Sequence, residues 1–235
     1  MIDVKDLAKN YAVDEQTLKA VDNVSFIAEK GDMISIIGHS GSGKTTLLSL
    51  IGGLTKPDAG SVTINGTDIW GLDDNSRSHF RNQHMSFIYQ FSSLIPTLTA
   101  LENILLPTAF GKFSGDVADY AKELIGIVGM KEKTNAYPSH LSGGQQRRIA
   151  IARAFINSPS IILADEPTGD LDEETEHEII RLFQRMNEDR KTTFVIVTHN
   201  NEIAAQAKKR FRMSGGVLNP ITAAYGGMTE VSGLK

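Results

Sequence analysis

The sequence predicts an α/β protein whose mostly parallel sheet is covered by helices. Short runs of apolar and β-branched residues alternate with longer amphipathic runs, and strand–helix–strand order at this spacing is typical of such a sheet. The runs at 161–163 and 194–197 are entirely apolar, which predicts strands buried on both faces. The stretch 91–145 has a helical pattern without a convincing strand. We therefore expect it to form a helical insertion into the α/β core.

The first half of the chain is predicted to hold strands separated by turn residues. Runs bounded by Gly, Asp or Asn predict strands at 24–27, 33–37, 61–64 and 86–89. Asn65 and Gly66 favour a tight hairpin turn after the third of these runs. A helix is expected over 44–51, because Gly52 and Gly53 follow it directly and end it.

The second half is predicted to alternate helices with two buried strands. The helices are expected over 99–106, 116–128, 146–156 and 173–187. The strands are expected over 160–165 and 193–198. The chain after Gly215 is rich in Gly and Thr and weakly patterned, so we expect a poorly ordered end.

Composition excludes several classes of protein. Of the 235 residues, 40% are hydrophobic and 22% charged, which is ordinary globular composition and excludes disorder, collagen and coiled coil. The net charge of −4 leaves no basic field over the whole molecule, although it does not exclude a local basic patch, and we expect no nucleic-acid partner. The absence of cysteine excludes disulfides, zinc knuckles and a thiol nucleophile.

The chain shows no targeting or membrane-spanning segment. Its N-terminus is polar and lacks the apolar core of a signal peptide. The longest apolar runs, such as 33–37 and 161–164, are far shorter than the ~18–20 residues that cross a bilayer. We expect a soluble, cytoplasmic protein whose membrane role, if it has one, comes through a partner.

A phosphate-binding loop follows the predicted strand 33–37. Residues 38–45 match the pattern G-x-x-x-x-G-K-[ST] and precede the helix expected over 44–51. Glycines let backbone N–H groups converge on phosphate oxygens, and the helix adds its positive N-terminal end. Lys44 would reach the β- and γ-phosphates, and Thr45 would give a hydroxyl to Mg²⁺. The candidate nucleotide-binding residues here are Gly38, His39, Ser40, Gly41, Ser42, Gly43, Lys44, Thr45 and Thr46.

Two carboxylates end the apolar strand at 160–165. In a parallel sheet the carboxyl ends of the strands form the edge where ligands sit. Asp165 is placed to hold the hydration shell of Mg²⁺, and Glu166 to polarise an attacking water as general base. Taken alone, the same pattern also fits a solvated strand end.

A second candidate anion-binding helix start lies at 141–145, which we call the signature segment. Its sequence is Leu-Ser-Gly-Gly-Gln, and a helix follows. Two phosphate-binding helix ends in one chain suggest that two chains share a nucleotide. The alternative is an ordinary Ser/Gly N-cap and turn.

With these motifs in place, the chain resembles the ATP-binding subunit of an ATP-binding-cassette (ABC) transporter. The signature segment is similar to that family's signature, and the motifs follow in the family's order from Met1 to about Leu218. The stretches 164–172 and 98–103 resemble the macrolide-exporter/lipoprotein-release subfamily, which also includes a cell-division ATPase. The resemblance implies a P-loop NTPase core with an N-terminal antiparallel β-subdomain and a helical subdomain. It predicts one domain over 1–235, with the core at 1–90 and 146–218, the helical signature subdomain at 91–145 and a tail at 219–235.

The resemblance also assigns roles to single residues. It implies that Tyr11 stacks on adenine (the alternative is a core tyrosine), that Gln90 contacts Mg²⁺ and the reactive water, and that His199 holds the γ-phosphate. It implies that Asp172 crosses a dimer interface. The signature residues expected on the opposite subunit's nucleotide are Ser142, Gly143, Gly144 and Gln145.

This chain departs mildly from the family at two positions. His39 stands where Pro is usual, with no expected loss of binding. Asp170 stands where a small or amide residue is more common, and its charge could alter closure of the dimer.

The resemblance finally implies the activity and its partners. We expect a Mg²⁺-dependent ATPase that forms a homodimer with ATP and powers export or other mechanical work on lipophilic or peptide substrates. An integral membrane permease subunit would dock near the segment from Gln90 to Phe110, holding the chain at the cytoplasmic face of the membrane. The alternatives are a signalling or scaffolding role at the membrane and a soluble, non-transport ATPase of the same family.

Overall fold

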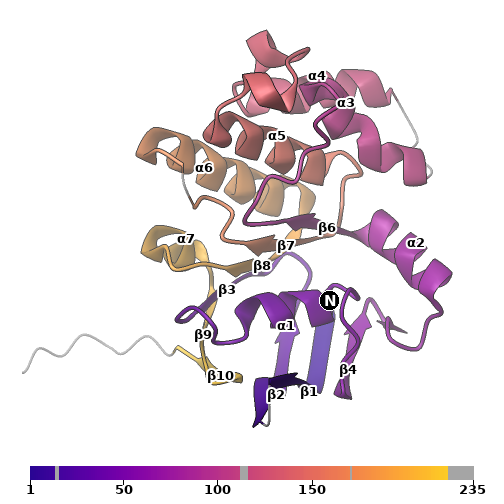
Figure 1. Cartoon of the computed structure of the whole chain (residues 1–235), viewed down its shortest axis with the longest axis vertical. Coiled ribbons are helices and arrows are strands. Elements are labelled where there is room, and N and C mark those ends of the chain that lie inside the picture. Colours follow the sequence, from indigo (N-terminus) through magenta and orange to yellow (C-terminus); the bar gives the residue numbers. More distant parts are fainter. Residues whose placement is uncertain (14–15, 112–115, 170, 222–235) are drawn as a thin grey trace, which may run out of the picture.

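The computed structural model describes residues 1–13, 16–111, 116–169 and 171–221 (Figure 1). Its strands are β1 (Ile2–Val13), β2 (Gln16–Ala28), β3 (Met33–Ile37), β4 (Ala59–Ile64), β5 (Thr67–Asp68), β6 (Met85–Ile88), β7 (Ile161–Asp165), β8 (Thr193–Val197), β9 (Lys209–Ser214) and β10 (Val217–Pro220). Its α-helices are α1 (Lys44–Ile51), α2 (Asp74–His84), α3 (Ala100–Leu105), α4 (Val117–Ile127), α5 (Gly143–Phe155), α6 (Glu173–Arg190) and α7 (Asn201–Gln206). Short 3-10 turns cover Leu106–Phe110, Lys131–Lys133 and Pro138–His140.

A mostly parallel sheet forms the centre of the molecule. Its strand order is β10-β9-β3-β8-β7-β6, and only the β9–β10 pair is antiparallel. The predicted α/β class is therefore confirmed. The bounds of β3 and α1 agree with those predicted from the sequence.

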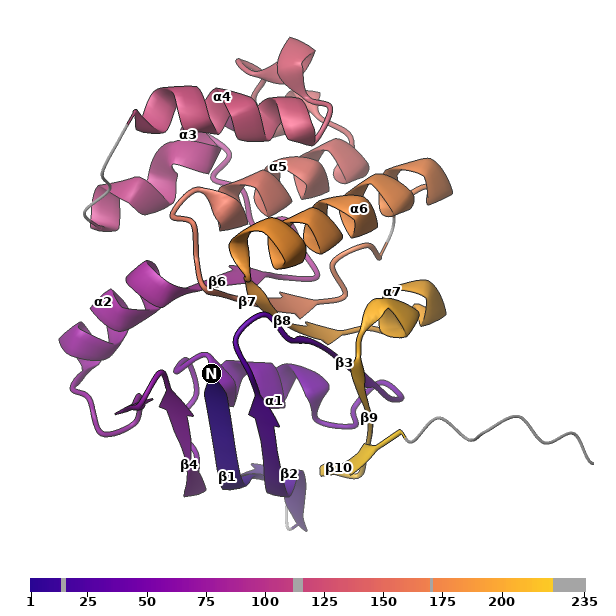
Figure 2. The same cartoon turned by 180° about the vertical axis from the view of Figure 1, so that it is seen from behind.

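This sheet separates two hydrophobic cores, as Figures 1 and 2 show. Helices α5, α6 and α7 cover one face, with α3 and α4 packed on α5, and Ile162 and Ala164 of β7 contribute to the first core there. Helix α1 covers the other face, where Ile161 and Leu163 contribute to the second core. Because successive side chains of a strand point to opposite faces, an all-apolar strand fits a sheet covered on both sides. The predicted burial of these strands on both faces is confirmed.

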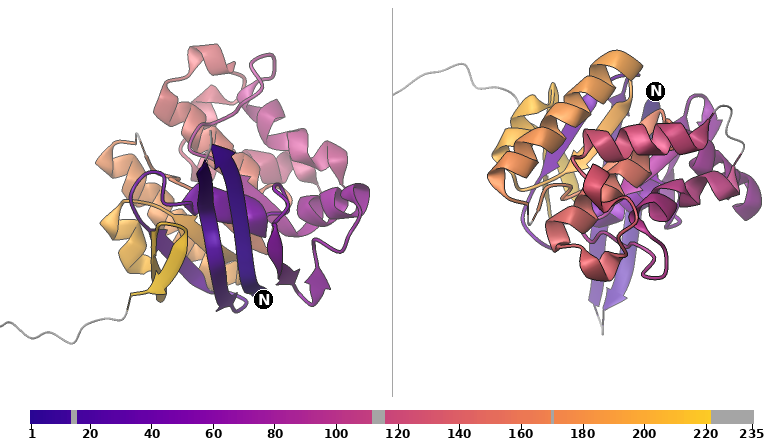
Figure 3. Two further views of the ribbon diagram at one scale, coloured as in Figure 1. Left: turned by 60° about the horizontal axis from the view of Figure 1, so that its bottom comes forward. Right: turned by 90° about the horizontal axis from the view of Figure 1, so that it is seen from above.

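A smaller antiparallel sheet packs beneath α1, visible from below in Figure 3. Its order is β2-β1-β4-β5, and its apolar side chains join the second core. Asn65 and Gly66 have φ angles of 49° and 85° and make the predicted turn between β4 and β5. Positive φ at both turn residues suits the twist of a hairpin. The expected N-terminal antiparallel β-subdomain is thus present.

Several elements differ from those predicted. Helix α5 begins at Gly143 rather than at residue 146, because Ser142 caps it. The expectation of poor order directly after Gly215 is wrong as far as Pro220, since β10 pairs with β9; residues 222–235 lie outside the described part of the chain. Strands β1, β9 and β10 and helices α2 and α7 have no counterpart among the elements predicted from the sequence.

The proposed subdomain boundary at 145/146 cuts across α5. That helix packs against α3 and α4 and contributes to the first core. The division into core, helical subdomain and tail remains a prediction.

Candidate functional site: a nucleotide cleft

A cleft of about 800 Å³ lies at the carboxyl ends of β3, β7 and β8, beside β1 and β2. It brings together most of the residues that the sequence predicted, although they are far apart in the chain. We call it the nucleotide cleft. It is lined by Tyr11, Leu18, Ala20, Gly38, His39, Ser40, Gly41, Gly43, Lys44, Thr45, Thr46, Gln90, Asp165, Glu166, Gly169 and His199.

The phosphate loop enters α1 through a glycine that no other residue could replace without strain. Gly43 is the N-cap of α1 with φ 102°, and a Cβ there would lie 1.9 Å from the carbonyl oxygen of Ala20. No side chain caps this helix end. The first backbone N–H groups of α1 therefore face the cleft without a side-chain acceptor, which suits an anion.

Lys44 lies within the loop that it would serve. Its Nζ donates to the carbonyl oxygens of Gly38 at 2.8 Å and His39 at 2.9 Å. His39 is exposed, whereas Ser42 is buried beneath the loop and its hydroxyl has no partner among the described residues. The ammonium group thus sits where phosphate oxygens could replace the two carbonyls.

The Thr45 hydroxyl and the Asp165 carboxylate, two oxygen groups that could bind a metal ion, meet in the cleft. The Thr45 hydroxyl donates to Asp165 Oδ2 at 2.7 Å. Burial raises the pKa of Asp165, and the charge of Glu166 raises it further, against the opposing effects of the Thr45 hydrogen bond and Lys44. Gln90, two residues after the end of β6, is exposed and lines the same cleft.

Glu166 and His199 are also brought together, as the sequence predicted. Glu166 Oε2 accepts hydrogen bonds from the Thr198 hydroxyl and from the backbone N–H of His199, both at 3.2 Å. His199 Nδ1 lies 3.0 Å from the same oxygen. The backbone of Glu166 has φ 46°, an uncommon angle for a side chain of this size and one that recurs at functional sites.

The signature segment lies away from the cleft. Ser142 Oγ accepts from the N–H of Gln145, and Gln145 Oε1 accepts from the N–H of Ser142, which makes a capping box at the start of α5. None of residues 142–145 is among the described residues that line the cleft. The phosphate loop and the signature segment therefore do not line one cleft within a single chain.

Two acidic residues follow the strand end. Asp172 caps α6 by accepting from the N–H and hydroxyl of Thr175 at 2.9 and 2.7 Å, and these bonds lower its pKa. Asp170 lies outside the described residues, so its predicted effect on closure stays a prediction.

Sequence reasoning missed two residues that hold the site together. Thr198 was expected only as the last residue of a strand, but its hydroxyl binds Glu166. Arg147 is buried, and its guanidinium contacts the backbone on either side of the cleft. Nothing in the pattern of a helix distinguishes such an arginine from a solvated one.

Fold and cleft together define a P-loop nucleotide-binding protein. The family model described as "ABC transporter" matches residues 21–169. The chain is 43% identical to the ABC transporter ATP-binding protein YtrE of Bacillus subtilis, covering 93% of this chain and 96% of that protein. It is 40% identical to the lipoprotein-releasing system ATP-binding protein LolD of Bordetella avium, covering 91% and 94% of the two chains.

Other similarities extend to a larger protein and to solved structures. The macrolide export ATP-binding/permease protein MacB of Syntrophobacter fumaroxidans is 38% identical, and the match covers 99% of this chain but 33% of that protein. A dimeric, post-hydrolysis structure of the ATP-binding cassette MJ0796 bound to ADP and Pi superposes with a TM-score of 0.88. It is 38% identical, and the match covers 95% of this chain and 100% of that one.

The chain belongs to the ABC transporter family as an ATP-binding, ATP-hydrolysing subunit. The resemblance that the motifs indicated, including the macrolide-exporter/lipoprotein-release subfamily, is confirmed. In the described part of the chain, no helix has both the length and the apolar character that crossing a membrane requires.

Proposed function

We propose that two copies of the chain close head to tail around two ATP molecules. Each nucleotide would lie between the phosphate loop of one subunit and the signature segment of the other. The observation that carries this proposal is the separation of the two helix ends within one chain: the cleft contains Lys44 but none of residues 142–145. The dimeric structures of the similar cassette MJ0796 support it.

Mg²⁺ fits the oxygen donors of the cleft. Thr45, Asp165 and Gln90 offer a hydroxyl, a carboxylate and an amide, the oxygen ligands that this hard cation takes, together with substrate phosphates. When bound, Mg²⁺ neutralises charge on the phosphates.

Hydrolysis would follow from the groups around the γ-phosphate. Glu166 takes a proton from the attacking water, whose oxygen forms the new bond to phosphorus as the bond to ADP breaks. Lys44 and His199 stabilise the charge that develops on the γ-phosphate oxygens. Tyr11, which is 38% exposed on β1, would stack on the adenine at the other end of the cleft.

Closure would depend on the γ-phosphate. Ser142 and the start of α5 have little to hold in ADP, so ATP binds the closed dimer better than the open one. Hydrolysis removes that difference and the dimer opens. Asp172 would lie at the seam between the subunits.

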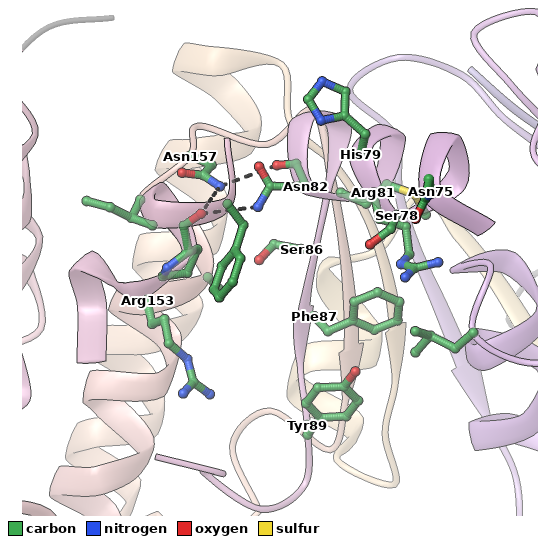
Figure 4. Close-up of a pocket in the computed structure, with 16 residues that line it drawn as sticks. Asn75, Ser78, His79, Arg81, Asn82, Ser86, Phe87, Tyr89, Arg153 and Asn157 are labelled. Carbon is green, nitrogen blue, oxygen red and sulfur yellow. Dashed lines mark hydrogen bonds between the residues drawn. The ribbon is translucent and has the colours of Figure 1, made fainter. Parts of the chain in front are cut away.

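A second hollow, which we call the docking groove, offers a surface for a permease subunit (Figure 4). It lies between α2, β6 and the end of α5, and it includes Pro107 and Phe110 of the segment predicted to dock. Phe87 and Tyr89 stack with ring centroids 5.5 Å apart, and Phe110 is 69% exposed. Such an aromatic, partly apolar hollow suits a short amphipathic helix.

Charge indicates what that helix carries. Arg81 donates to the Gly53 carbonyl, and Arg153 to the carbonyls of Ser92 and Ser93. None of the 16 described residues that line the groove is an aspartate or glutamate. Burial lowers the pKa of both guanidinium groups, and an acidic partner would offset the cost of burying these two cations. The occupant would therefore be an acidic, amphipathic helix of the permease.

This partner would hold the subunit at the cytoplasmic face of the membrane. Two relatives are named for macrolide export and for lipoprotein release, which favours the export of lipophilic or peptide cargo that the permease would recognise.

The test is ATPase turnover of the purified chain beside Glu166→Gln, with size-exclusion chromatography in ATP. We expect turnover by the wild type, none by the variant, and an ATP-dependent dimer of the variant. A variant that is monomeric and fully active would contradict the roles given to Glu166 and the signature segment.

A further inference from the structure

A buried arginine on the signature helix α5 connects three parts of the site. Arg147 is 5% exposed, and its Nη1 donates to the carbonyl oxygens of Tyr89 and Glu166, both at 3.1 Å. Burying a guanidinium is costly unless its donors are satisfied, so these bonds hold the two carbonyls at defined positions. The fold thus places a rigid cation where α5, the end of β6 and the residue after β7 meet.

Each of these carbonyls belongs to a segment with a proposed role in hydrolysis. Tyr89 directly precedes Gln90, the predicted ligand of Mg²⁺ and the reactive water. Glu166 is the proposed base itself. Its N–H donates to the Val197 carbonyl at 2.9 Å, and its own carbonyl also accepts from Gly169 N–H at 3.2 Å. Hydrogen bonds therefore hold both the N–H and the carbonyl of Glu166. Of these hydrogen bonds, the one from Arg147 is the one that comes from α5.

Arg147 shares its helix with the signature segment. It lies five residues after Ser142, the N-cap of α5, within one continuous helix of 13 residues. A shift of α5 must therefore displace the guanidinium, and with it the carbonyls of Tyr89 and Glu166. The left-handed backbone of Glu166 makes this linkage consequential, because such a conformation persists only where its surroundings hold it.

From this geometry we infer that Arg147 is a positioning residue for hydrolysis. It aligns Gln90 and Glu166 of its own chain with the signature helix, so that engagement of the signature segment by the partner's nucleotide orders the base of the same chain. The inference rests on the proposed head-to-tail dimer. It assigns to Arg147 no contact with ATP.

The test compares Arg147→Met, which keeps the length but removes the charge and donors, with Arg147→Lys, which keeps a charge and N–H donors on a shorter side chain. For Arg147→Met we expect kcat to fall roughly 10- to 100-fold, since displacing a reacting group by about 1 Å costs this much. The KM for ATP and the affinity for a fluorescent ATP analogue should stay within about threefold. Arg147→Lys should recover part of kcat.

Arg77→Gln is the matched control. Arg77 on α2 is also partly buried and donates to a backbone carbonyl, that of Leu72, at 2.9 Å, but it touches neither α5 nor the cleft. The Arg77→Gln variant should have a lower melting temperature than the wild type but an unchanged kcat. An unchanged kcat in Arg147→Met, or a KM that rises as much as kcat falls, would overturn the inference. If Arg147→Met does not fold, a KM for ATP that rises in Arg147→Lys as much as its kcat falls would overturn the inference.

A second measurement separates this inference from the proposed function. Glu166→Gln and Glu166→Gln/Arg147→Met are compared by size-exclusion chromatography in ATP. We expect both to dimerise. If neither does, the proposed function fails, whereas loss of the dimer in the double variant alone would show that Arg147 acts on association rather than on the base.

Discussion

The two glycine-rich helix starts of this chain are built differently. At α1, the N-cap is Gly43 and no side chain accepts from the first turn. At α5, the N-cap is Ser142, and a capping box with Gln145 already uses its hydroxyl. The first helix end opens into a cleft beside Lys44 and Asp165, whereas the second lies outside that cleft.

This difference indicates that the two helix ends have different functions. The α1 end is prepared for phosphate, because its N–H groups and the nearby ammonium face one cleft. The α5 end is stable without a ligand, since Ser142 and Gln145 satisfy each other. We therefore expect α1 to determine whether nucleotide binds one subunit, and α5 to determine whether two subunits close.

The largest effect should come from the base. Glu166→Gln keeps the size of the side chain but removes the group that takes the proton, so kcat should fall by roughly 10²- to 10⁴-fold while ATP affinity is retained. Single-turnover hydrolysis and binding of a fluorescent ATP analogue measure the two quantities. Loss of affinity together with turnover would show that Glu166 supports binding rather than proton transfer.

The next effect separates the two helix ends by affinity. Lys44→Met removes the cation at the α1 end, and we expect ATP affinity of the isolated subunit to fall by roughly 10- to 100-fold. Ser142→Ala, at the α5 end, should leave this affinity unchanged and lower turnover. Equal loss of affinity in both variants would contradict the division between the helix ends.

A third prediction concerns stability. Gly43→Ala adds a Cβ that meets the Ala20 carbonyl at 1.9 Å in a left-handed backbone, which should cost about 2–4 kcal/mol of the free energy of unfolding. Gly143→Ala is the matched control. Gly143 is the first residue of α5, and no atom lies within 4 Å of a Cβ added there. Thermal or urea unfolding of both variants measures the difference. A comparable loss in Gly143→Ala would refute the account of two differently built ends.

The smallest predicted effect is a pH dependence. Burial raises the pKa of Asp165 above its ordinary 3.8, so the folded state binds this proton more tightly than the unfolded state. The free energy of unfolding therefore falls as the pH rises from 3.8, the ordinary pKa of Asp, through the higher pKa of Asp165 in the folded state. The melting temperature of Asp165→Asn relative to wild type, without nucleotide, should be higher at pH 7.5 than at pH 4. A difference that does not vary with pH would argue against this electrostatic cost.

Sequence patterns predicted the parts of the fold in which local and global signals agree. The strand Met33–Ile37 and the helix Lys44–Ile51 have apolar faces, flanking glycines and a motif between them, and their bounds were predicted correctly. Helix α2 was missed because none of its residues is buried, so it has no apolar period. Its available signals were the Asp73 cap, Asp74 in the first turn and the basic last turn, and these are weak without an apolar face.

The same limit applies to the site. Lys44, Thr45, Asp165 and Glu166 could be predicted because each stands in a motif with a stated chemistry. The contacts of Arg147 and Thr198 could not, since they depend on carbonyl and carboxylate groups that only the tertiary fold brings near. Docking of a permease near the segment from Gln90 to Phe110 stays a prediction, and no sequence signal indicated the wall that α2 forms in the groove.

The central claim is that the two helix ends of different subunits share one nucleotide, and one added charge tests it most directly. Gly143→Asp places a carboxylate in the first turn of α5, where open space and the helix dipole accept it, but where it would repel a γ-phosphate. In a Glu166→Gln background, we predict that ATP gives a dimer on size-exclusion chromatography and that adding Gly143→Asp leaves a monomer that still binds one ATP with unchanged affinity. A dimer that persists, or an affinity lost in the monomer, would contradict the account.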